Sequence, residues 1–297
     1  MATRPGYNSA QLAIELDGKV AGPVQSLQMP AYRLEPVVAP IGPDRRPALG
    51  NNTHIEPMQA EFEPLQAPAL LDWALSLPEH RPAELAGAAL VLDQNGKLQR
   101  RVEWREGLLT ELRLPMLDAA SKQRFGIGIS WQPGSVVYAK PDGSARLPAS
   151  PRGKGPTLAN FRVSGLPFDA SFITRVGLPT VTSKIAEDGF GSFRPPRPSY
   201  KRIDLGELTL EFSARSRDAV LAWVQKIIDD GRILEEEYLD IVIDLLDAAM
   251  KKVLLSLRLS GCGLLAYEEA RLESMADQAA TVTLRLSISE LQLKLGS

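Results

Sequence analysis

Cysteine and histidine are scarce in this chain. Cys262 is the only cysteine, which excludes an internal disulfide and a zinc site built from several cysteines. His54 and His80 are the only histidines, and neither has a partner at metal-ligand spacing, so we assign neither a metal nor a catalytic role. Cys262 lies between Gly261 and Gly263 in an apolar run, which favours a small buried residue over a nucleophile. The sequence therefore offers no catalytic, cofactor-binding or metal-binding residues, and we expect no cofactor.

An excess of charge and a long apolar run are also lacking. The 34 basic and 36 acidic residues give a net charge of -2, whereas non-specific nucleic-acid binding requires a basic surplus. No apolar stretch approaches the ~18 residues that a membrane span requires. The first seven residues, Met-Ala-Thr-Arg-Pro-Gly-Tyr, lack the apolar core of a secretory signal. We therefore expect cytoplasmic synthesis and no membrane span.

Length and composition are those of an ordinary folded protein. The chain has 297 residues, which suits two domains, and its 44% hydrophobic content allows each half to bury a core. Aromatic residues make up only 6%, which leaves little material for an exposed aromatic surface.

Short groups of residues occur twice, in the same order. Glu61, Phe62 and Trp73 recur as Glu211, Phe212 and Trp223 at an offset of 150, and Leu92, Asp93 and Lys97 recur as Leu246, Asp247 and Lys251 at an offset of 154. Each group lies in a segment with the same sequence of patterns: strand, amphipathic helix, strand pair, short loop, final strand. The chain is therefore predicted to contain a duplicated β-rich unit.

The first unit is predicted over residues 8–133. Alternating apolar and polar residues predict strands at 11–17, 20–27, 32–38, 55–62, 88–92, 98–104, 108–114 and 125–131. Asp17-Gly18 and Asn95-Gly96 are typical of tight hairpin turns. Helical spacing predicts a helix over 68–77 with Trp73 as a core anchor, and the Pro- and Gly-rich residues 40–51 predict a long exposed loop.

The second unit is predicted over residues 158–297, after a Pro- and Gly-rich linker at 134–157. Its predicted strands are 161–163 with 172–176 as partner, 203–212, 238–245, 253–259, 264–267 and one long strand at 280–295. A helix at 218–228 with Ser216 as N-cap carries Trp223, and residues 187–200 predict a second long loop. The fold class is thus mainly β with one helix per domain, each domain a small barrel or sandwich.

Several charged groups admit a structural and a functional interpretation. Glu235-Glu236-Glu237 is typical of a solvated surface, with a subunit-facing or channel-facing role as the alternative. Residues 194–198, Arg-Pro-Pro-Arg-Pro, favour a stiff extended arm over a ligand for a proline-recognition domain. Basic doublets are typical solubility features, although one could face an acidic cargo; they are Arg45-Arg46, Arg100-Arg101, Lys201-Arg202 and Lys251-Lys252.

The order of these elements, together with several short motifs, resembles the tail-tube fold of phages and contractile injection systems. In the first unit the motifs are residues 15–19, Glu-Leu-Asp-Gly-Lys; residues 71–73, Leu-Asp-Trp; and residues 114–122, Leu-Pro-Met-Leu-Asp-Ala-Ala-Ser-Lys. The corresponding motifs of the second unit are residues 160–165, 221–223 and 257–261, while 273–278, Glu-Ser-Met-Ala-Asp-Gln, replaces the Asp-Ala-Ala-Ser segment. The resemblance covers residues 8–133 and 158–295.

This resemblance implies a non-enzymatic structural protein with two tandem tail-tube-like domains. Proteins of this kind form rings of six folds around a channel, and a double-domain chain is similar to phage hub proteins, in which three chains supply six folds. The implied roles are inner tube, tube initiator or baseplate hub. The implied partners are further copies of the chain, neighbouring tube, hub or baseplate proteins, and DNA or effector protein as cargo. The implied place is a virion tail or injection particle assembled in the cytoplasm.

Two other classes of function remain as alternatives. A monomeric two-domain β-sandwich that binds carbohydrate or a partner protein predicts a cluster of exposed aromatic residues. An enzyme requires a convergent acid–base or nucleophile set, for which two histidines and one cysteine are poor material. Open strand edges favour self-association, because unpaired backbone groups are a template for pairing with another chain.

Overall fold

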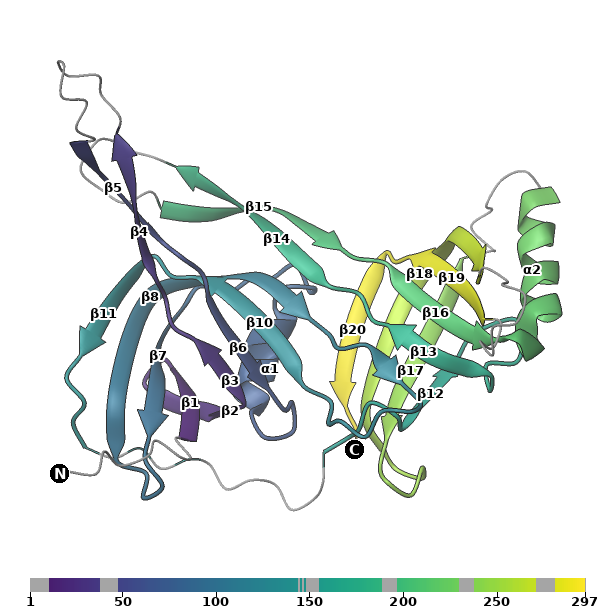
Figure 1. Ribbon diagram of the computed structural model, residues 1–297, viewed down its shortest axis with the longest axis horizontal. Coiled ribbons are helices and arrows are strands. Elements are labelled where there is room, and N and C mark those ends of the chain that lie inside the picture. Colours follow the sequence, from purple (N-terminus) through teal and green to yellow (C-terminus); the bar gives the residue numbers. More distant parts are fainter. Residues whose placement is uncertain are drawn as a thin grey trace, which may run out of the picture.

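The computed structural model describes residues 11–37, 48–143, 145, 147, 155–188, 197–229, 238–270 and 281–296. The protein is mainly β, and its strands form two strongly curved sheets that lie in two lobes side by side (Figure 1). The first half of the chain builds most of one lobe and the second half most of the other.

The sheet of the first lobe has 10 strands. Its main path runs in the order β2-β1-β7-β8-β10-β6-β3, where the strands are β1 (Gln11–Leu16), β2 (Lys19–Val24), β3 (Ser26–Gln28), β6 (Met58–Phe62), β7 (Leu85–Leu92), β8 (Leu98–Arg113) and β10 (Ile127–Gln132). Three further strands join this sheet off the main path: β11 (Ser135–Ala139), β14 (Val181–Asp188) and β15 (Arg197–Leu205).

The sheet of the second lobe has 8 strands. Its main path runs in the order β12-β17-β18-β19-β16-β13-β9. The bounds of these strands are β9 (Leu117–Asp118), β12 (Phe161–Ser164), β13 (Ile173–Gly177), β16 (Leu208–Ser213), β17 (Leu239–Leu246), β18 (Val253–Glu269) and β19 (Thr281–Ser287). One further strand, β20 (Glu290–Leu295), pairs with β18 off this path. Strand by strand, β1, β7, β8, β10, β6 and β3 therefore correspond to β12, β17, β18, β19, β16 and β13. The two units are structural repeats of one another.

Local backbone features repeat along the two longest strands, at a constant offset of 155 residues. Glu106 in β8 and Gly261 in β18 both have positive φ, at 54° and 63°. Thr110 is skipped in the pairing of β8 with β10, and Leu265 is skipped in the pairing of β18 with β19, so both strands carry a bulge at the same place. Each long strand bends there and takes part in two sets of pairings, one on each side of the bend.

The hairpin turns before these strands repeat as well. Asp93 accepts hydrogen bonds from the backbone N–H groups of Asn95 and Lys97, both at 2.9 Å. Asp247 accepts from the N–H groups of Lys251 and Lys252 at 2.8 and 3.2 Å. The repeated Leu-Asp motif, Leu92-Asp93 and Leu246-Asp247, thus lies at the same turn in both units.

Several sequence predictions differ from the structure. Residues 108–114 form no separate strand, since β8 continues to Arg113, and the predicted strands 253–259 and 264–267 are one strand, β18. The single strand predicted over 280–295 is divided into β19 and β20, which pair with the two halves of β18. The partner of β12 is β17, not the segment 172–176. Part of the predicted linker forms β11, which pairs with β8.

The described ends of the two predicted long loops belong to hairpin arms. Residues 48–51 belong to β5 (Ala48–Ile55), which pairs with β4 (Tyr32–Val37) in a separate 2-stranded sheet; residues 40–47, with Arg45-Arg46, lie outside the described residues. Residues 187–188 and 197–200 belong to β14 and β15, and 189–196 lie outside the described residues. We call β4–β5 the first arm and β14–β15 the second arm. Each arm connects the last strand of its unit's sheet path, β3 or β13, to the next strand, β6 or β16.

Each unit carries one α-helix in the described part of the chain. Helix α1 (Pro68–Leu75) begins with proline, which fits the first turn, and α2 (Arg217–Asp229) follows the 3-10 turn η1 (Ala214–Ser216). Trp73 is 3% exposed and donates its indole N–H to the carbonyl of Ala83 at 3.1 Å, which confirms it as a core anchor. Trp223 is half-buried against Phe168. Ser216 is buried and its hydroxyl has no hydrogen-bond partner among the described residues, so it is not the predicted cap.

Most buried apolar side chains of both units form one continuous cluster, and a smaller cluster in the first unit consists of Ala13, Ala88, Leu90, Leu92 and Leu98. In the first unit the continuous cluster includes Trp104 and Trp131, whose ring centroids lie 5.1 Å apart, and in the second Phe212 and Leu284. The division into domains at 8–133 and 158–297 stays a prediction from the sequence.

Candidate assembly interface

Strands from one unit extend the sheet of the other. Val181 and Thr182 of β14 pair antiparallel with Leu112 and Glu111 of β8 in the first unit. Conversely, β9 of the first unit pairs with β13 of the second, with Leu117 opposite Val176. The unit-to-unit contact, which we call the junction, is therefore built from main-chain pairing at two separate sheet edges.

Asp118 connects the two units through its side chain and backbone. Arg175 of β13 donates from Nε to Asp118 Oδ2 at 3.2 Å, and the neighbouring Ala119 N–H donates to the carbonyl of Thr174 at 3.0 Å. The N–H of Ala120 donates to Asp118 Oδ1 at 2.8 Å. This backbone hydrogen bond and the Arg175 charge hold the pKa of Asp118 below its usual value. The Leu-Asp-Ala-Ala-Ser motif of the first unit thus lies at the junction.

A buried carboxylate lies next to this segment. Glu63 is 7% exposed and accepts from Gln25 at 3.1 Å, Gln66 at 2.8 Å and Arg124 at 3.0 Å. Arg124 in turn forms a β-bridge with Thr157, just before the second unit. The carboxylate is fully occupied by donors, which is how a buried charge is tolerated. Its surroundings indicate a positioning role for the connection between the units.

The junction buries apolar side chains where the second arm crosses the first unit. Val181 and Leu112 are both 0% exposed, and the nearby Leu109 is 0% exposed as well. Tyr200 of β15 packs against the same core, and burial raises the pKa of its hydroxyl to about 12. The second arm runs from the second lobe across the first (Figure 1). Apolar burial and strand pairing therefore act together at this contact.

The equivalent edges at the two ends of the chain are open in the described structure. The first arm, β4–β5, pairs with no other described strand and projects away from its lobe (Figure 1). The outer half of β18, beyond Gly261, pairs with β19 on one side and with no described strand on the other. Tyr32 on the first arm is 48% exposed, and Leu265 on β18 is 52% exposed. Among the described residues, one end of the chain thus offers an arm that pairs with no further strand, although side-chain hydrogen bonds such as Tyr32 to the Val136 carbonyl at 3.2 Å hold its base on the first lobe, and the other end offers an unpaired strand edge.

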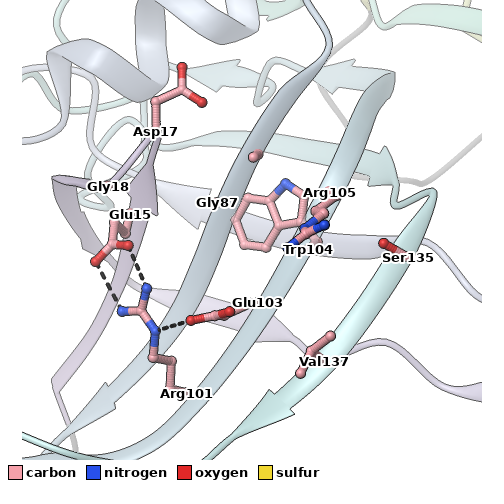
Figure 2. A pocket seen from close by; sticks show the side chains of 11 residues that line it. Glu15, Asp17, Gly18, Gly87, Arg101, Glu103, Trp104, Arg105, Ser135 and Val137 are labelled. Carbon is pink, nitrogen blue, oxygen red and sulfur yellow. Dashed lines mark hydrogen bonds and ion pairs between the residues drawn. The ribbon is translucent and has the colours of Figure 1, made fainter.

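A hollow of ≈ 200 Å³ lies on the first unit between β1, β7, β8 and β11 (Figure 2). Arg101 on its wall donates to the Glu15 carboxylate at 2.6 and 3.0 Å and to Glu103 at 2.6 Å. Hydrogen bonding to Glu15 is the main cause that raises the pKa of Arg101 above its usual range. Figure 2 shows the three side chains pointing toward one another. An arginine matched by two carboxylates is held in place and always protonated, so the wall of this hollow carries an ion-pair network.

The residues singled out in the sequence are scattered. Cys262 is 1% exposed, and burial raises the pKa of its thiol to about 11, which keeps it protonated and unreactive. His80 is exposed at positive φ, and His54 lies in the first arm. Of the basic doublets, Arg101 is held in the ion-pair network, and Lys251 closes a turn through its backbone. Glu235-Glu236-Glu237 and residues 194–196 lie outside the described residues.

No group of three or more His, Cys, Asp or Glu side chains able to hold a metal ion occurs within the described part of the chain. Among the same residues, no helix is both long and apolar enough to cross a membrane. The junction contributed no signal to the sequence patterns, because strand pairing between distant segments leaves no local periodicity. The segment around Asp118 is the exception: its motif at 114–122 is visible in the sequence, although its contact with Arg175 is not.

The chain is similar to solved chains from contractile injection particles. A chain of the anti-feeding prophage baseplate is 17% identical with a TM-score of 0.39, over 45% of this chain and 89% of that chain. A chain of the anti-feeding prophage tube-terminating cap is 16% identical with a TM-score of 0.40, over 52% of this chain and 95% of that chain. A chain of the PVC sheath/tube terminator in the extended state is 16% identical with a TM-score of 0.38, over 45% and 92%. No protein-family model and no curated protein sequence matches the chain.

Proposed function

We propose that this protein is a non-enzymatic structural component of a phage tail or contractile injection particle that assembles head to tail into a ring. The observation that carries the proposal is the junction: two copies of one fold are joined edge to edge by strand pairing, while the equivalent edges at both ends of the chain are open. The particle class comes from the sequence resemblance of residues 114–122 and their counterparts.

A contact that joins unit two to unit one within the chain is heterologous, because it uses a different surface on each unit. Heterologous contacts generate closed rings when the rotation between units closes, and open filaments when it does not. Repeating the same contact between chains would place all units in one series. We propose closure with six units from three chains, as in the resemblance to tail hubs, in the inner tube, the tube initiator or the baseplate hub.

The ring is expected to act by its geometry. Paired sheet edges would give a rigid wall around a channel that conducts DNA or effector protein, and neighbouring tube, hub or baseplate proteins would stack on its faces. Assembly would take place in the cytoplasm, and the protein would then be part of the particle.

Mass photometry together with negative-stain imaging of the purified protein tests the proposal. We expect particles of three times the 32.4 kDa chain mass with a central hole, in equilibrium with smaller species on dilution. Monodisperse particles of 32.4 kDa at every concentration would instead support the alternative, a monomeric two-domain β-sandwich that binds carbohydrate or a partner protein. The test needs no knowledge of the cargo.

A further inference from the structure

The two arms of this protein are equivalent elements in different states. Each follows the last strand of its unit's sheet path, β3 or β13, and returns to the next strand, β6 or β16. The second arm is docked on the first unit through β14 and β8, whereas the first arm contacts no unit by strand pairing in the described structure. The docked arm therefore provides a template for a contact that the free arm could make.

The register of the template transfers to the first arm through the pairing within each arm. Val181 pairs with Leu205 in the second arm, and Tyr32 pairs with Ile55 in the first. Both pairs close their arm three residues before the next strand begins. Tyr32 and Arg33 therefore hold the positions that Val181 and Thr182 hold in the docked arm.

The receiving strand transfers in the same way. Leu112 of β8 lies opposite Ile129 of β10, and Tyr267 of β18 lies opposite Leu284 of β19. With the offset of 155 residues set by the bulges and the positive-φ positions, the counterparts of Leu112 and Glu111 are Tyr267 and Ala266. These two residues lie on the side of β18 that no described strand covers.

Burial differs between the occupied and the open version of this contact. Val181 on the docked arm is 0% exposed, whereas its counterpart Tyr32 is 48% exposed. On the receiving strand, Leu112 is fully buried and its counterpart Tyr267 is only half-buried. Both open positions are thus less buried than their equivalents, although Tyr32 contacts its own unit through a hydrogen bond from its hydroxyl to the Val136 carbonyl at 3.2 Å and through the ring of Tyr138.

We propose that the first arm of one chain adds to the outer half of β18 in a second copy of this chain, antiparallel, with Tyr32 opposite Tyr267 and Arg33 opposite Ala266. This contact rests on the proposed ring and specifies how one chain joins the next. Charge is compatible with it: Arg33, which is paired with Glu56 at 2.6 Å within its own chain, then lies on the same face as Glu268, which lies 3.7 Å from Arg285. Both side chains are largely exposed in the single chain, at 74% and 60%. The arm and the edge lie in different lobes, so the contact propagates head to tail (Figure 1).

Disulfide trapping tests the register directly. The full chain with Cys262→Ala, Arg33→Cys and Ala266→Cys is purified, its assembly is measured under reducing conditions, and it is then oxidised and run on a non-reducing gel. We expect most of the protein to migrate as covalent multimers, because residues opposite one another in paired strands are close enough for a disulfide. The matched internal control carries Thr182→Cys and Glu111→Cys, whose disulfide forms within one chain and leaves the monomer band in place.

The outcomes separate the contact from the ring. Multimers with Arg33→Cys and Ala266→Cys, but only monomers when Arg33→Cys is combined with the exposed Gln292→Cys on β20, support the register. Rings under reducing conditions together with a formed internal control but no interchain disulfide overturn the register while the proposed ring stands. Absence of rings before oxidation overturns both.

Removal of the first arm provides a second test that does not depend on thiols. Residues 32–55 are replaced by Asn-Gly, a tight-turn dipeptide, because the carbonyl of Ala31 and the N–H of Glu56 already lie 2.7 Å apart. The 10-stranded sheet contains no strand of the first arm, so the variant is expected to keep a β-type circular dichroism spectrum, reduced by the two deleted strands, and cooperative unfolding. We expect it to be a monomer at concentrations where the wild type forms rings. A folded variant that still forms rings would overturn the contact.

Discussion

At the scale of single residues, the junction depends on a few polar contacts in a mainly apolar surround. Asp118 combines a backbone hydrogen bond within its own loop with an ion pair to Arg175 of the other unit. The side chains of Asp118 and Arg175 are 30% and 50% exposed, so solvent screens the pair and its contribution is modest. Its value lies in fixing the register of β9 against β13 more than in stability.

Asp118→Asn is expected to lower the thermal midpoint by roughly 2 °C at neutral pH, because the amide keeps the shape but loses the charge that attracts Arg175. The pKa of Asp118 is lowered in the folded state, so its contribution is present above the pKa of the unfolded chain and is lost as the pH falls through the folded pKa. The difference between wild type and variant should therefore begin to shrink in thermal melts below about pH 4, the usual pKa of an aspartate, and disappear only below the lower pKa of the folded state. Arg162→Gln, which breaks an ion pair with Asp244 inside the second unit, is the control for a general loss of charge. A difference that persists at low pH would contradict this account.

Trp104 and Trp131 offer a comparison of two buried indoles. Trp104 donates its N–H to the carbonyl of Leu85 at 3.1 Å, whereas the N–H of Trp131 has no partner among the described residues. Both side chains are at most 1% exposed, so Trp→Phe removes similar buried volume at each site. We expect Trp104→Phe to cost about 1–2 kcal/mol more than Trp131→Phe in urea unfolding, because only the first removes a side-chain hydrogen bond. Equal costs would show that the hydrogen bond contributes nothing net.

At the scale of elements, the sequence predicts what depends on local pattern. The alternation at 11–17, the Asp17-Gly18 turn and the helical spacing around Trp73 are all confirmed, since each is written within a few neighbouring residues. The continuity of β8 was not predictable, because Glu106 and Gly107 interrupt the alternation exactly as a turn would. Positive φ at Glu106 bends the strand without ending it.

The sequence does not predict the arms and the junction, for a different physical reason. Proline and glycine in 40–51 and 187–200 favour loops locally, and strand pairing overrides that preference at the described residues 48–51, 187–188 and 197–200. The pairing of β14 with β8 joins segments about 70 residues apart in sequence, and no short pattern encodes such a partner. The duplication was visible in the sequence, yet which edge of one copy meets the other required the structure.

Gly261 tests whether the bend in β18 needs glycine. Its φ is 63°, and an added Cβ would lie 2.6 Å from Ser289 Oγ and 2.8 Å from Ser289 Cβ. We expect Gly261→Ala to destabilise the protein by about 2–4 kcal/mol, from left-handed strain and overlap together. In a Ser289→Gly background the overlap is absent, and the cost should fall to about 1–2 kcal/mol in urea unfolding. An unchanged cost would assign the effect to backbone strain alone.

At the scale of the whole molecule, the covalent connection and the junction hold the two units together through different residues. The connecting residues tie the units together through contacts such as the N–H of Leu158 to the carbonyl of Gln123 at 2.9 Å, but the shared core and the paired edges lie elsewhere. If contacts between chains copy the junction, then a junction without a covalent connection must be stable in the assembled state. The covalent link would then set which units are neighbours and not whether they bind.

Splitting the chain tests whether the junction is stable without the covalent connection. Residues 1–150 and 151–297 co-expressed as separate polypeptides can fold against one another, since the break removes none of the strand pairs at the junction. We expect the two fragments to co-purify in equal amounts through an affinity tag on one of them, and to form rings of the same size as the intact chain by negative-stain imaging. The matched control adds Thr182→Pro to the second fragment, which places a proline in β14 opposite Glu111 of β8, where it disturbs strand pairing and should reduce co-purification. Fragments that fold but separate would show that the junction holds only when the chain is continuous, and a contact of the same kind between chains would then be too weak to close a ring.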